Sequence, residues 1–293
     1  MPRPIDHLVL AVRDLDAAAS TYRSLGFQVG GPNHHPWGTH NRIVQLGGSF
    51  LELIGLGPTF KRLDGPDPAA PFANTIARFL EQREGLAQVA LQSHDAQADA
   101  DAFARAGHAS TGMLDFSRTA EGPDGQRREI AFTLAFAAGS ADDAPEFFVC
   151  QHHRPENFWA PTLQRHPNTA RCLLGVVMAV EAPSGPDPLL QTLFGPDAVA
   201  ASPDGVVVAA GPQTVEIVRA DRVHARYGAD LGKAGFVAYR IGVASLDAAR
   251  DCLEQAAVPF RRHDAGLIVG PAAAHGVALS FEPLRLGLQG DVP

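Results

Sequence analysis

The chain opens with an alternation of apolar and polar residues that predicts a strand followed by a helix. Residues 5–12 alternate like a half-buried β-strand. Asp14 can then cap a helix whose apolar residues recur at helical spacing, and Gly26 can end that helix. Further strands are expected over residues 27–30, 39–46 and 49–55, the last two joined by a Gly-Gly turn that suits a tight hairpin. The segment therefore predicts a βαβββ unit.

The same pattern recurs three more times along the chain. A second unit is expected from strands over 86–93, 129–136 and 146–151, with a helix over 96–106. A third is expected from strands over 173–180, 206–210 and 214–219, with a short helix over 189–194; a fourth starts with a strand over 236–243 and ends at Glu282. The intervening Pro- and Asn-containing stretch predicts two halves, 1–151 and 172–293, with a linker over 152–171.

These units predict an α+β fold of four βαβββ modules that form paired, cup-shaped, curved mixed sheets with helices on the outer faces. Which modules pair is left open, first with second or first with fourth. Successive strand residues point to opposite faces. If Leu8 and Leu10 face the helix, then His7 faces the inside of the cup, and the same alternation turns Phe50 and Glu52 inward. Cup-shaped sheets favour a small-molecule ligand.

Composition narrows the class of protein. The net formal charge is -8 and no Lys/Arg run occurs, so a nucleic-acid-binding surface is not expected. No stretch reaches about 18 consecutive apolar residues, so no membrane span is expected, and the start of the chain lacks an apolar signal region. A cytoplasmic protein is therefore expected. The three cysteines lie far apart, which favours buried thiols over disulfides or a zinc ribbon.

His7 and Glu52 are the first candidates for chemistry because alternation places both side chains on the concave face. An imidazole and a carboxylate on one face can form half of a site for Zn²⁺, Mn²⁺, Ni²⁺ or Fe²⁺. A strand histidine with a satisfied hydrogen bond and a solvated strand carboxylate are the alternative interpretations.

Three segments carry a resemblance to a known family. Residues 5–12 (IDHLVLAV), 38–42 (GTHNR) and 50–54 (FLELI) are together similar to the glyoxalase-like domain subgroup of the vicinal oxygen chelate superfamily. The likeness extends more loosely through Ser117-Arg118 to residues 146–149 and 166–170, and beyond about residue 172 only the module pattern supports it. The resemblance implies paired βαβββ modules and metal-ligand roles for His7 and Glu52.

The partner module departs from the family pattern. The position equivalent to His7 is Gln88 in the second unit, Gly175 in the third and Ala238 in the fourth, so no second histidine is available there. Gln88 could be a third ligand through its carbonyl oxygen, as the resemblance implies, or could bind substrate or simply fill space. A divalent metal, Zn, Ni, Mn or Fe, is the expected cofactor.

Other polar and aromatic residues are candidates for the rim and walls of the cup. His40, with His34 and His35, follows the expected second strand and could be a third metal ligand, a general base or an exposed loop residue. Alternation predicts that Asn41 and Gln45 face inward to orient a substrate. Trp37, Phe50 and Trp159 could form aromatic walls or could simply belong to the core. Arg240 could bind a substrate carboxylate or form an ion pair with Glu216 or Glu282.

The resemblance implies an enzyme of the lyase or isomerase type that acts on a small oxygenated molecule through metal-stabilised enolate or oxyanion chemistry, with Glu52 and His40 as candidate catalytic residues. Two alternatives stay open: a metal-free protein that sequesters a small molecule, as bleomycin-resistance relatives do, and a ring-cleaving dioxygenase. A homodimer is common in this superfamily and is a further open alternative.

Overall fold

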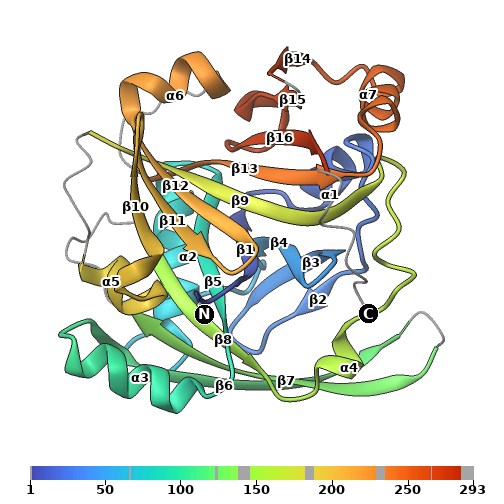
Figure 1. The fold of residues 1–293 in the computed structure, drawn as a ribbon. Helices are drawn as coiled ribbons and strands as arrows, with labels where there is room; N and C mark the ends of the chain where they lie inside the picture. Colours follow the sequence, from blue (N-terminus) through green and yellow to red (C-terminus); the bar gives the residue numbers. More distant parts are fainter. Residues whose placement is uncertain are drawn as a thin grey trace.

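The computed structural model describes residues 2–65, 67–122, 125–137, 146–181, 188–228, 235–264 and 266–284. Four βαβββ modules follow one another along the chain (Figure 1). The first contains β1 (Ile5–Ala11), α1 (Leu15–Ser24), β2 (Asn33–His34), β3 (Thr39–Leu46) and β4 (Ser49–Leu56). The second contains β5 (Gly85–Ser93), α3 (Ala96–Arg105), β6 (Ala109–Glu121), β7 (Arg127–Ala137) and β8 (Glu146–His152).

The second half of the chain repeats this order. The third module contains β9 (Ala170–Val180), α5 (Pro188–Phe194), β10 (Val199–Ser202), β11 (Gly205–Ala210) and β12 (Gln213–Arg219). The fourth contains β13 (Gly235–Val243), α7 (Leu246–Gln255), β14 (Phe260–His263), β15 (Gly266–Val269) and β16 (Ala278–Pro283). Three helices lie between modules, α2 (Ala70–Gln82), α4 (Pro155–Phe158) and α6 (Ala220–Tyr227), and two short 3-10 helices cover Pro196–Ala198 and Pro271–Ala273. The predicted α+β fold of paired modules is confirmed.

The sheet order decides which modules pair. Sheet A has the order β2-β3-β4-β1-β5-β8-β7-β6 and sheet B the order β10-β11-β12-β9-β13-β16-β15-β14. The first module therefore pairs with the second and the third with the fourth. In each sheet the first strands of the two modules are antiparallel neighbours at the centre, and each is parallel to the last strand of its own module. The hydrogen-bonded strands of sheet A end at His152 and those of sheet B begin at Ala170.

Local sequence explains the helix ends that the pattern predicted. The Asp14 carboxylate accepts hydrogen bonds from the backbone N–H groups of Asp16 and Ala17 at the start of α1, and Asp95 caps α3 in the same way. Gly26 ends the first helical segment with φ at +83°, and a Cβ there would lie 2.7 Å from Cβ of Asn168. A side chain at this position would therefore be strained and would clash with the second half of the chain.

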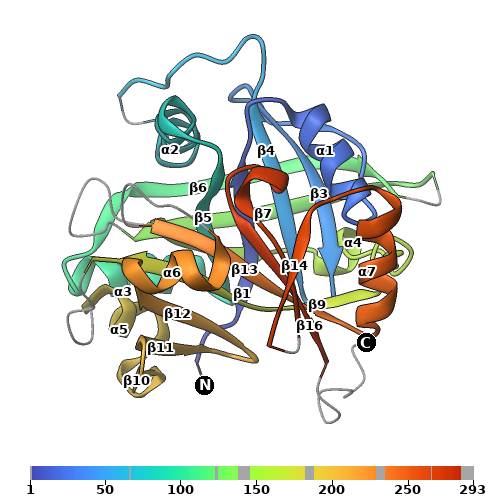
Figure 2. The same ribbon diagram turned by 90° about the horizontal axis from the view of Figure 1, so that it is seen from above.

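The two halves share one hydrophobic core. The outer faces of both sheets, together with helices α1, α3, α5 and α7, contribute to a single continuous cluster of buried side chains. Figures 1 and 2 show the end of α1 next to α7, although these helices come from opposite ends of the chain. The hydroxyls of Tyr22 and Tyr239 are 2.9 Å apart across this interface, and both side chains are fully buried. Each fully buried large apolar side chain contributes roughly 1.5–3 kcal/mol, so each half stabilises the other.

Two helices lie on the concave faces, where the sequence pattern predicted none. Helix α2 packs Phe72, Ile76 and Leu80 against Val9, Ala11 and Ala90 on the inner face of sheet A. Helix α6 packs Val223 and Tyr227 against the inner face of sheet B. Each of these helices follows the last strand of the first module in its half. The cup of sheet A is therefore partly filled by α2.

Three strand predictions differ from the structure, and one of them concerns β10, which was not expected in the third module. The expected strand over 27–30 is not one; the second strand is the two-residue β2, and Gly30 contributes a single backbone hydrogen bond to Ile43. The long strand β6 was not predicted, because its Ser, Thr, Gly and Asp residues lack a clear alternation. Among the described residues, no helix is both long and apolar enough to cross a membrane.

Candidate functional site

A narrow pocket of about 60 Å³ opens on the concave face of sheet A, beside α2. Its walls are mainly aromatic and aliphatic, and a small number of polar groups converge on it, which is the usual composition of a small-molecule site. The lining residues are His7, His35, Trp37, Asn41, Ile43, Phe50, Glu52, Phe72, Phe116, Arg118, Phe132, Leu134, Cys150 and Phe158.

His7 and Glu52 meet in this pocket. In the parallel pair of β1 and β4, His7 lies opposite Phe50 and Val9 opposite Glu52, so the two polar side chains are diagonal neighbours on one face. Nε2 of His7 is 3.8 Å from Oε2 of Glu52, and each residue is only 5% exposed. Since metal–nitrogen and metal–oxygen bonds to Zn²⁺ are each about 2.0–2.2 Å, the two atoms are close enough to share one ion.

A β-bulge brings Asp6 onto the same face as His7. The register between β1 and β5 shifts between Ile5 and His7, which leaves Asp6 as the extra residue. The Asp6 carboxylate, 2% exposed, accepts a hydrogen bond of 2.7 Å from Nδ1 of His7 and lies 3.1 Å from Nε2 of His152. Burial raises the pKa of Asp6, but the hydrogen bonds from His152 and His7 outweigh it and lower the pKa to about 2. Asp6 is therefore an anion that fixes both imidazole rings.

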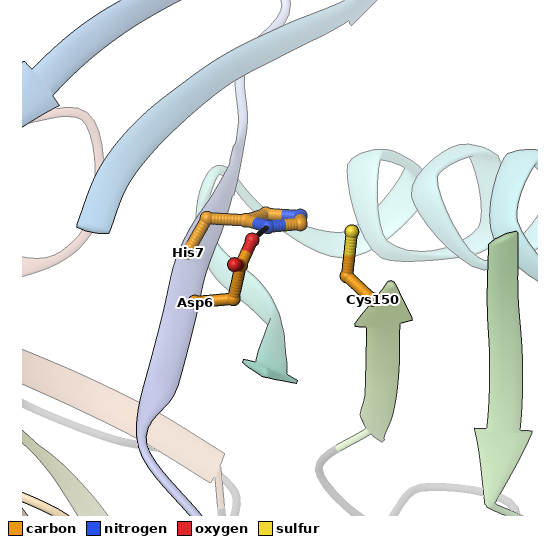
Figure 3. A group of neighbouring side chains, drawn as sticks. All are labelled: Asp6, His7 and Cys150. Atoms are coloured by element: carbon orange, nitrogen blue, oxygen red, sulfur yellow. Dashed lines mark hydrogen bonds and ion pairs between the residues drawn. The ribbon is translucent and has the colours of Figure 1, made fainter. Parts of the chain in front are cut away.

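Cys150 lies beside this pair (Figure 3). Its Sγ and ligand atoms of Asp6 and His7 lie within 4.8 Å of one another, so this trio is a second arrangement that could hold a metal ion. Burial raises the pKa of the Cys150 thiol well above its ordinary value, and the carboxylates of Asp6 and Glu52 raise it further. The Asp6 carboxylate is already occupied by two imidazoles. The pair formed by Nε2 of His7 and Glu52 fits a metal better.

Asn41 orients the Glu52 carboxylate. Nδ2 of Asn41 donates a hydrogen bond of 2.5 Å to Oε1 of Glu52, and Asn33 donates one of 2.9 Å to Oδ1 of Asn41. This leaves Oε2 of Glu52 directed toward His7. Burial raises the pKa of Glu52, while the charges of His7 and Arg118 and the hydrogen bond from Asn41 oppose that rise. The chain thus presents a carboxyl group whose proton affinity is increased, within reach of the pocket.

Aromatic rings hold His7 and wall the pocket. The Phe50 ring stacks on His7 with centroids 4.3 Å apart, and Phe148 contacts the same ring edge-on at 5.4 Å. Trp37 lies in the pocket, stacked on His35 at 4.8 Å. Gln45 is inward, as predicted, but its amide binds the backbone of Phe158 and Ala160. Gln45 therefore anchors the segment after the second module over the pocket.

Gln88 is completely buried and has no hydrogen-bond partner among the described residues, through either its amide oxygen or its nitrogen. It lies opposite Val9 on β5, on the face that α2 covers, and does not line the pocket itself. An unpartnered buried amide costs about 1–3 kcal/mol. The position that corresponds to Glu52 in the second module is filled by Phe148, which pairs with Ala90 as Glu52 pairs with Val9.

Besides Gln45 and Gln88, two more predicted site residues do not line the pocket. His40, on β3, pairs with Gly55 on β4 and points to the opposite face from its neighbour Asn41, and the geometry gives no support for its role as a base. Arg240 lies in sheet B, where it forms ion pairs with Glu216 at 3.0 Å and Glu282 at 3.7 Å. The ion-pair interpretation of Arg240 agrees with the structure, and a substrate contact at the pocket in sheet A does not.

The structure adds site residues that the sequence did not single out. Asp6 was missed because a bulge breaks the alternation, and Phe116 and Arg118 were missed as pocket residues because β6 was not predicted. His35 takes the place expected for His40: it is a neutral imidazole in the pocket, since burial, followed by the charges of Arg118, His34 and His40, lowers its pKa to about 3. Helical spacing of Phe72, Ile76 and Leu80, with Pro71 at the helix start, was a usable signal for α2.

Comparisons with known proteins agree with this architecture. The sequence profile described as "Glyoxalase-like domain" matches residues 5–194, more than half of the chain. No curated protein matches the sequence significantly. A hypothetical protein from Staphylococcus aureus superposes with a TM-score of 0.69 and 14% identity, covering 96% of this chain and 100% of that one.

Two further solved structures share the fold. A mutant of 4-hydroxymandelate synthase from Streptomyces coelicolor superposes with a TM-score of 0.59 and 14% identity. The superposition covers 97% of this chain and 93% of the synthase chain. A xylose isomerase-like TIM barrel/4-hydroxyphenylpyruvate dioxygenase fusion protein has a TM-score of 0.54 at 12% identity, covering 99% of this chain and 50% of its own. At such low identity these likenesses show the fold and leave the reaction open.

Proposed function

Because the chain belongs to the glyoxalase-like domain family of the vicinal oxygen chelate superfamily, we propose that it is a divalent-metal-dependent enzyme of the lyase or isomerase type that acts on a small oxygenated molecule. His7 and Glu52 would hold the metal. When bound, the ion would supply Lewis acidity that stabilises an enolate or similar oxyanion.

The observation that carries this proposal is the way the two nitrogens of His7 are used. Nδ1 donates to the buried Asp6 carboxylate, while Nε2 faces Glu52 inside the pocket. Metal-binding histidines usually donate their second ring N–H to a carboxylate or carbonyl, which fixes the tautomer and raises ligand basicity. The same hydrogen bond leaves the Nε2 lone pair free to bind a cation. A histidine that served packing alone would not need a buried carboxylate at Nδ1 and a second carboxylate near Nε2.

The chain's own residues would position the substrate and move its proton. Asn41 holds one oxygen of Glu52, and the raised pKa of Glu52 favours proton uptake by this carboxylate. Trp37, Phe72 and Phe132 line the pocket with apolar surface, which limits the access of water to the reacting atoms.

Gln88 is the candidate for a third ligand in this proposal. Its amide oxygen is buried and accepts no hydrogen bond from the described residues. This is expected of an oxygen that contacts a bound ligand. In the second module, Phe148 occupies the position that corresponds to Glu52. A phenyl ring cannot bind a cation as a carboxylate does, so this residue favours the alternative of a metal-free binding protein. The number of metal ligands that the chain supplies therefore distinguishes the metal-dependent enzyme from the metal-free binding protein.

The test is the metal content of the untagged protein, prepared without chelators and measured by inductively coupled plasma mass spectrometry. The proposal expects nearly one transition-metal ion per chain in the wild type and a loss of that ion in both His7→Ala and Glu52→Gln. Cys150→Ala and His40→Ala serve as matched controls and should keep the metal. The metal-loaded protein would then be assayed against 2-oxoaldehydes, catechols and lactones.

Two results would overturn parts of this proposal. A wild-type protein that is metal-free and cannot be loaded with Zn²⁺, Ni²⁺, Mn²⁺ or Fe²⁺ would favour the binding protein. A metal that is lost in Cys150→Ala and kept in Glu52→Gln would place the ion in the trio of Asp6, His7 and Cys150. Loading with Co²⁺ distinguishes these sites, since only a cysteine ligand gives a thiolate-to-cobalt charge-transfer band.

A further inference from the structure

Arg118 on β6 stands where the inner pocket meets a larger groove. It lines both the 60 Å³ pocket and an open groove of about 890 Å³ that runs beside it along the segment after β8. Ile43 and Phe158 also line both spaces. On β6 the Arg118 position shares its face with Phe116, which belongs to the pocket wall. Arg118 therefore lies at the junction of the two spaces.

The Arg118 guanidinium has no protein anion of its own. Among the described residues, none forms a hydrogen bond or an ion pair with it, although it attracts Glu52 across the pocket. Two other partly buried arginines are paired, Arg3 with Asp99 at 2.5 Å and Arg240 with Glu216 at 3.0 Å, whereas Arg83 lies over the ring of Phe79. Burial lowers the pKa of Arg118, which indicates incomplete solvation, yet a guanidinium stays charged in proteins. A half-buried, unpaired guanidinium is the typical partner of a carboxylate ligand.

The walls between Arg118 and His7 suit a flat apolar group. Trp37 and Phe116 lie 5.1 Å apart in an edge-to-face arrangement, and the rings of Phe116 and Phe132 are nearly parallel. Nε1 of Trp37 is buried and, among the described residues, has no hydrogen-bond acceptor. The small volume of the inner pocket admits only a small group beyond these rings. Glu156 also lines the outer groove, so the groove itself is not uniformly positive.

We infer that the site binds a small aromatic carboxylic acid, whose carboxylate pairs with Arg118 at the pocket mouth and whose flat body lies along Trp37, Phe116 and Phe132. The inference rests on the proposed function only for the end of the ligand that faces His7 and Glu52. The contact with Arg118 needs no metal. Its failure can therefore be told apart from the failure of the metal site.

The experiment compares an acid with its neutral isostere. Phenylacetate and phenylacetamide have nearly the same shape, and their dissociation constants are measured by isothermal titration calorimetry on protein treated with EDTA and dialysed. The wild type should bind the acid at least about tenfold more tightly than the amide, since a hydrogen-bonded ion pair is lost with the amide. Arg118→Gln should bring the ratio close to one, while Arg118→Lys, which keeps the charge, should retain part of it.

A matched control separates the local contact from the general charge of the protein. Arg127→Gln changes the net charge by the same amount at an exposed neighbouring site and should leave the ratio unchanged. The inference is overturned if phenylacetate does not bind, if the wild type does not prefer it, or if the preference survives in Arg118→Gln. A preference that appears only after Zn²⁺ is added, and that Arg118→Gln does not reduce, would assign the carboxylate to the metal.

Discussion

Asp6 and His7 are consecutive in the chain, yet their side chains lie on the same face of β1, with 2.7 Å between Oδ1 of Asp6 and Nδ1 of His7. Neighbouring residues of a regular strand point to opposite faces. The bulge at Asp6 changes this locally and places the carboxylate behind the imidazole ring. Because the ionised carboxylate can only accept, Nδ1 of His7 donates, and Nε2 is left free toward Glu52.

Asp6→Asn should therefore weaken metal binding without removing a ligand. Loss of the carboxylate behind a metal-binding histidine typically costs about 10- to 100-fold in affinity, because the ring loses its fixed tautomer and some basicity. The dissociation constant for Zn²⁺ would be measured by competition with a chelating dye. Asp16→Asn, on the exposed face of α1, is the control and should bind as the wild type does. An unchanged affinity in Asp6→Asn would contradict the orienting role.

Gln88→Leu should have opposite effects on stability and on metal binding. Leucine has a similar size and removes the unpartnered amide, so the metal-free protein should gain about 1 kcal/mol in its free energy of unfolding. If Gln88 is a ligand, the same substitution weakens Zn²⁺ binding. Gln92→Leu on the same strand is the control and should destabilise, since Gln92 donates a hydrogen bond of 3.0 Å to Gly48. A loss of stability in metal-free Gln88→Leu would contradict this account.

His35 should make the folded protein sensitive to mild acid. Burial, with the charges of Arg118, His34 and His40, lowers its pKa from 6.5 to about 3. Below pH 6.5 the unfolded chain takes up a proton that the folded chain does not, so the free energy of unfolding falls as the pH falls from 6.5 toward 3. The slope for one proton approaches about 1.4 kcal/mol per pH unit.

This pH dependence can be checked by urea unfolding of the metal-free protein between pH 5 and pH 7, a range set by the shift of the His35 pKa to about 3. His35→Gln should unfold with a flatter dependence on pH than the wild type, whatever its absolute stability. His94→Gln, at an exposed position, should keep the wild-type slope. Equal slopes for the wild type and His35→Gln would show that His35 is not the group responsible.

The contact between Tyr22 and Tyr239 should couple the two halves energetically. Their hydroxyls are 2.9 Å apart in the shared core, so Tyr22→Phe and Tyr239→Phe should each cost about 1 kcal/mol, and the double variant less than the sum. Chemical denaturation of the four proteins gives the coupling energy. Tyr227→Phe is the control, since its buried hydroxyl has no partner among the described residues and its loss should cost little. Fully additive effects would mean that the hydroxyl pair does not join the halves.

The sequence alone determined the features that depend on local periodicity. Alternation along β1 and β4 turned His7, Phe50 and Glu52 to one face, and the structure places all three in the pocket. The repeated order of strand and helix signals likewise gave the four modules, because each signal lies within a short stretch of chain. The resemblance to the glyoxalase-like domain rested on those same segments and is confirmed by the family match.

Tertiary structure decided what depends on partners distant in the chain. The bulge that turns Asp6 inward is defined only against β5, and the hydrogen bond from His152 joins residues 146 positions apart. The face that α2 covers and the place of Arg118 between pocket and groove also depend on how strands assemble. Alternation sets the direction of a side chain relative to its own strand, whereas convergence of side chains requires the register, curvature and packing of the whole sheet. The sequence therefore determined which residues face the cup, and only the folded sheet decided which of them meet.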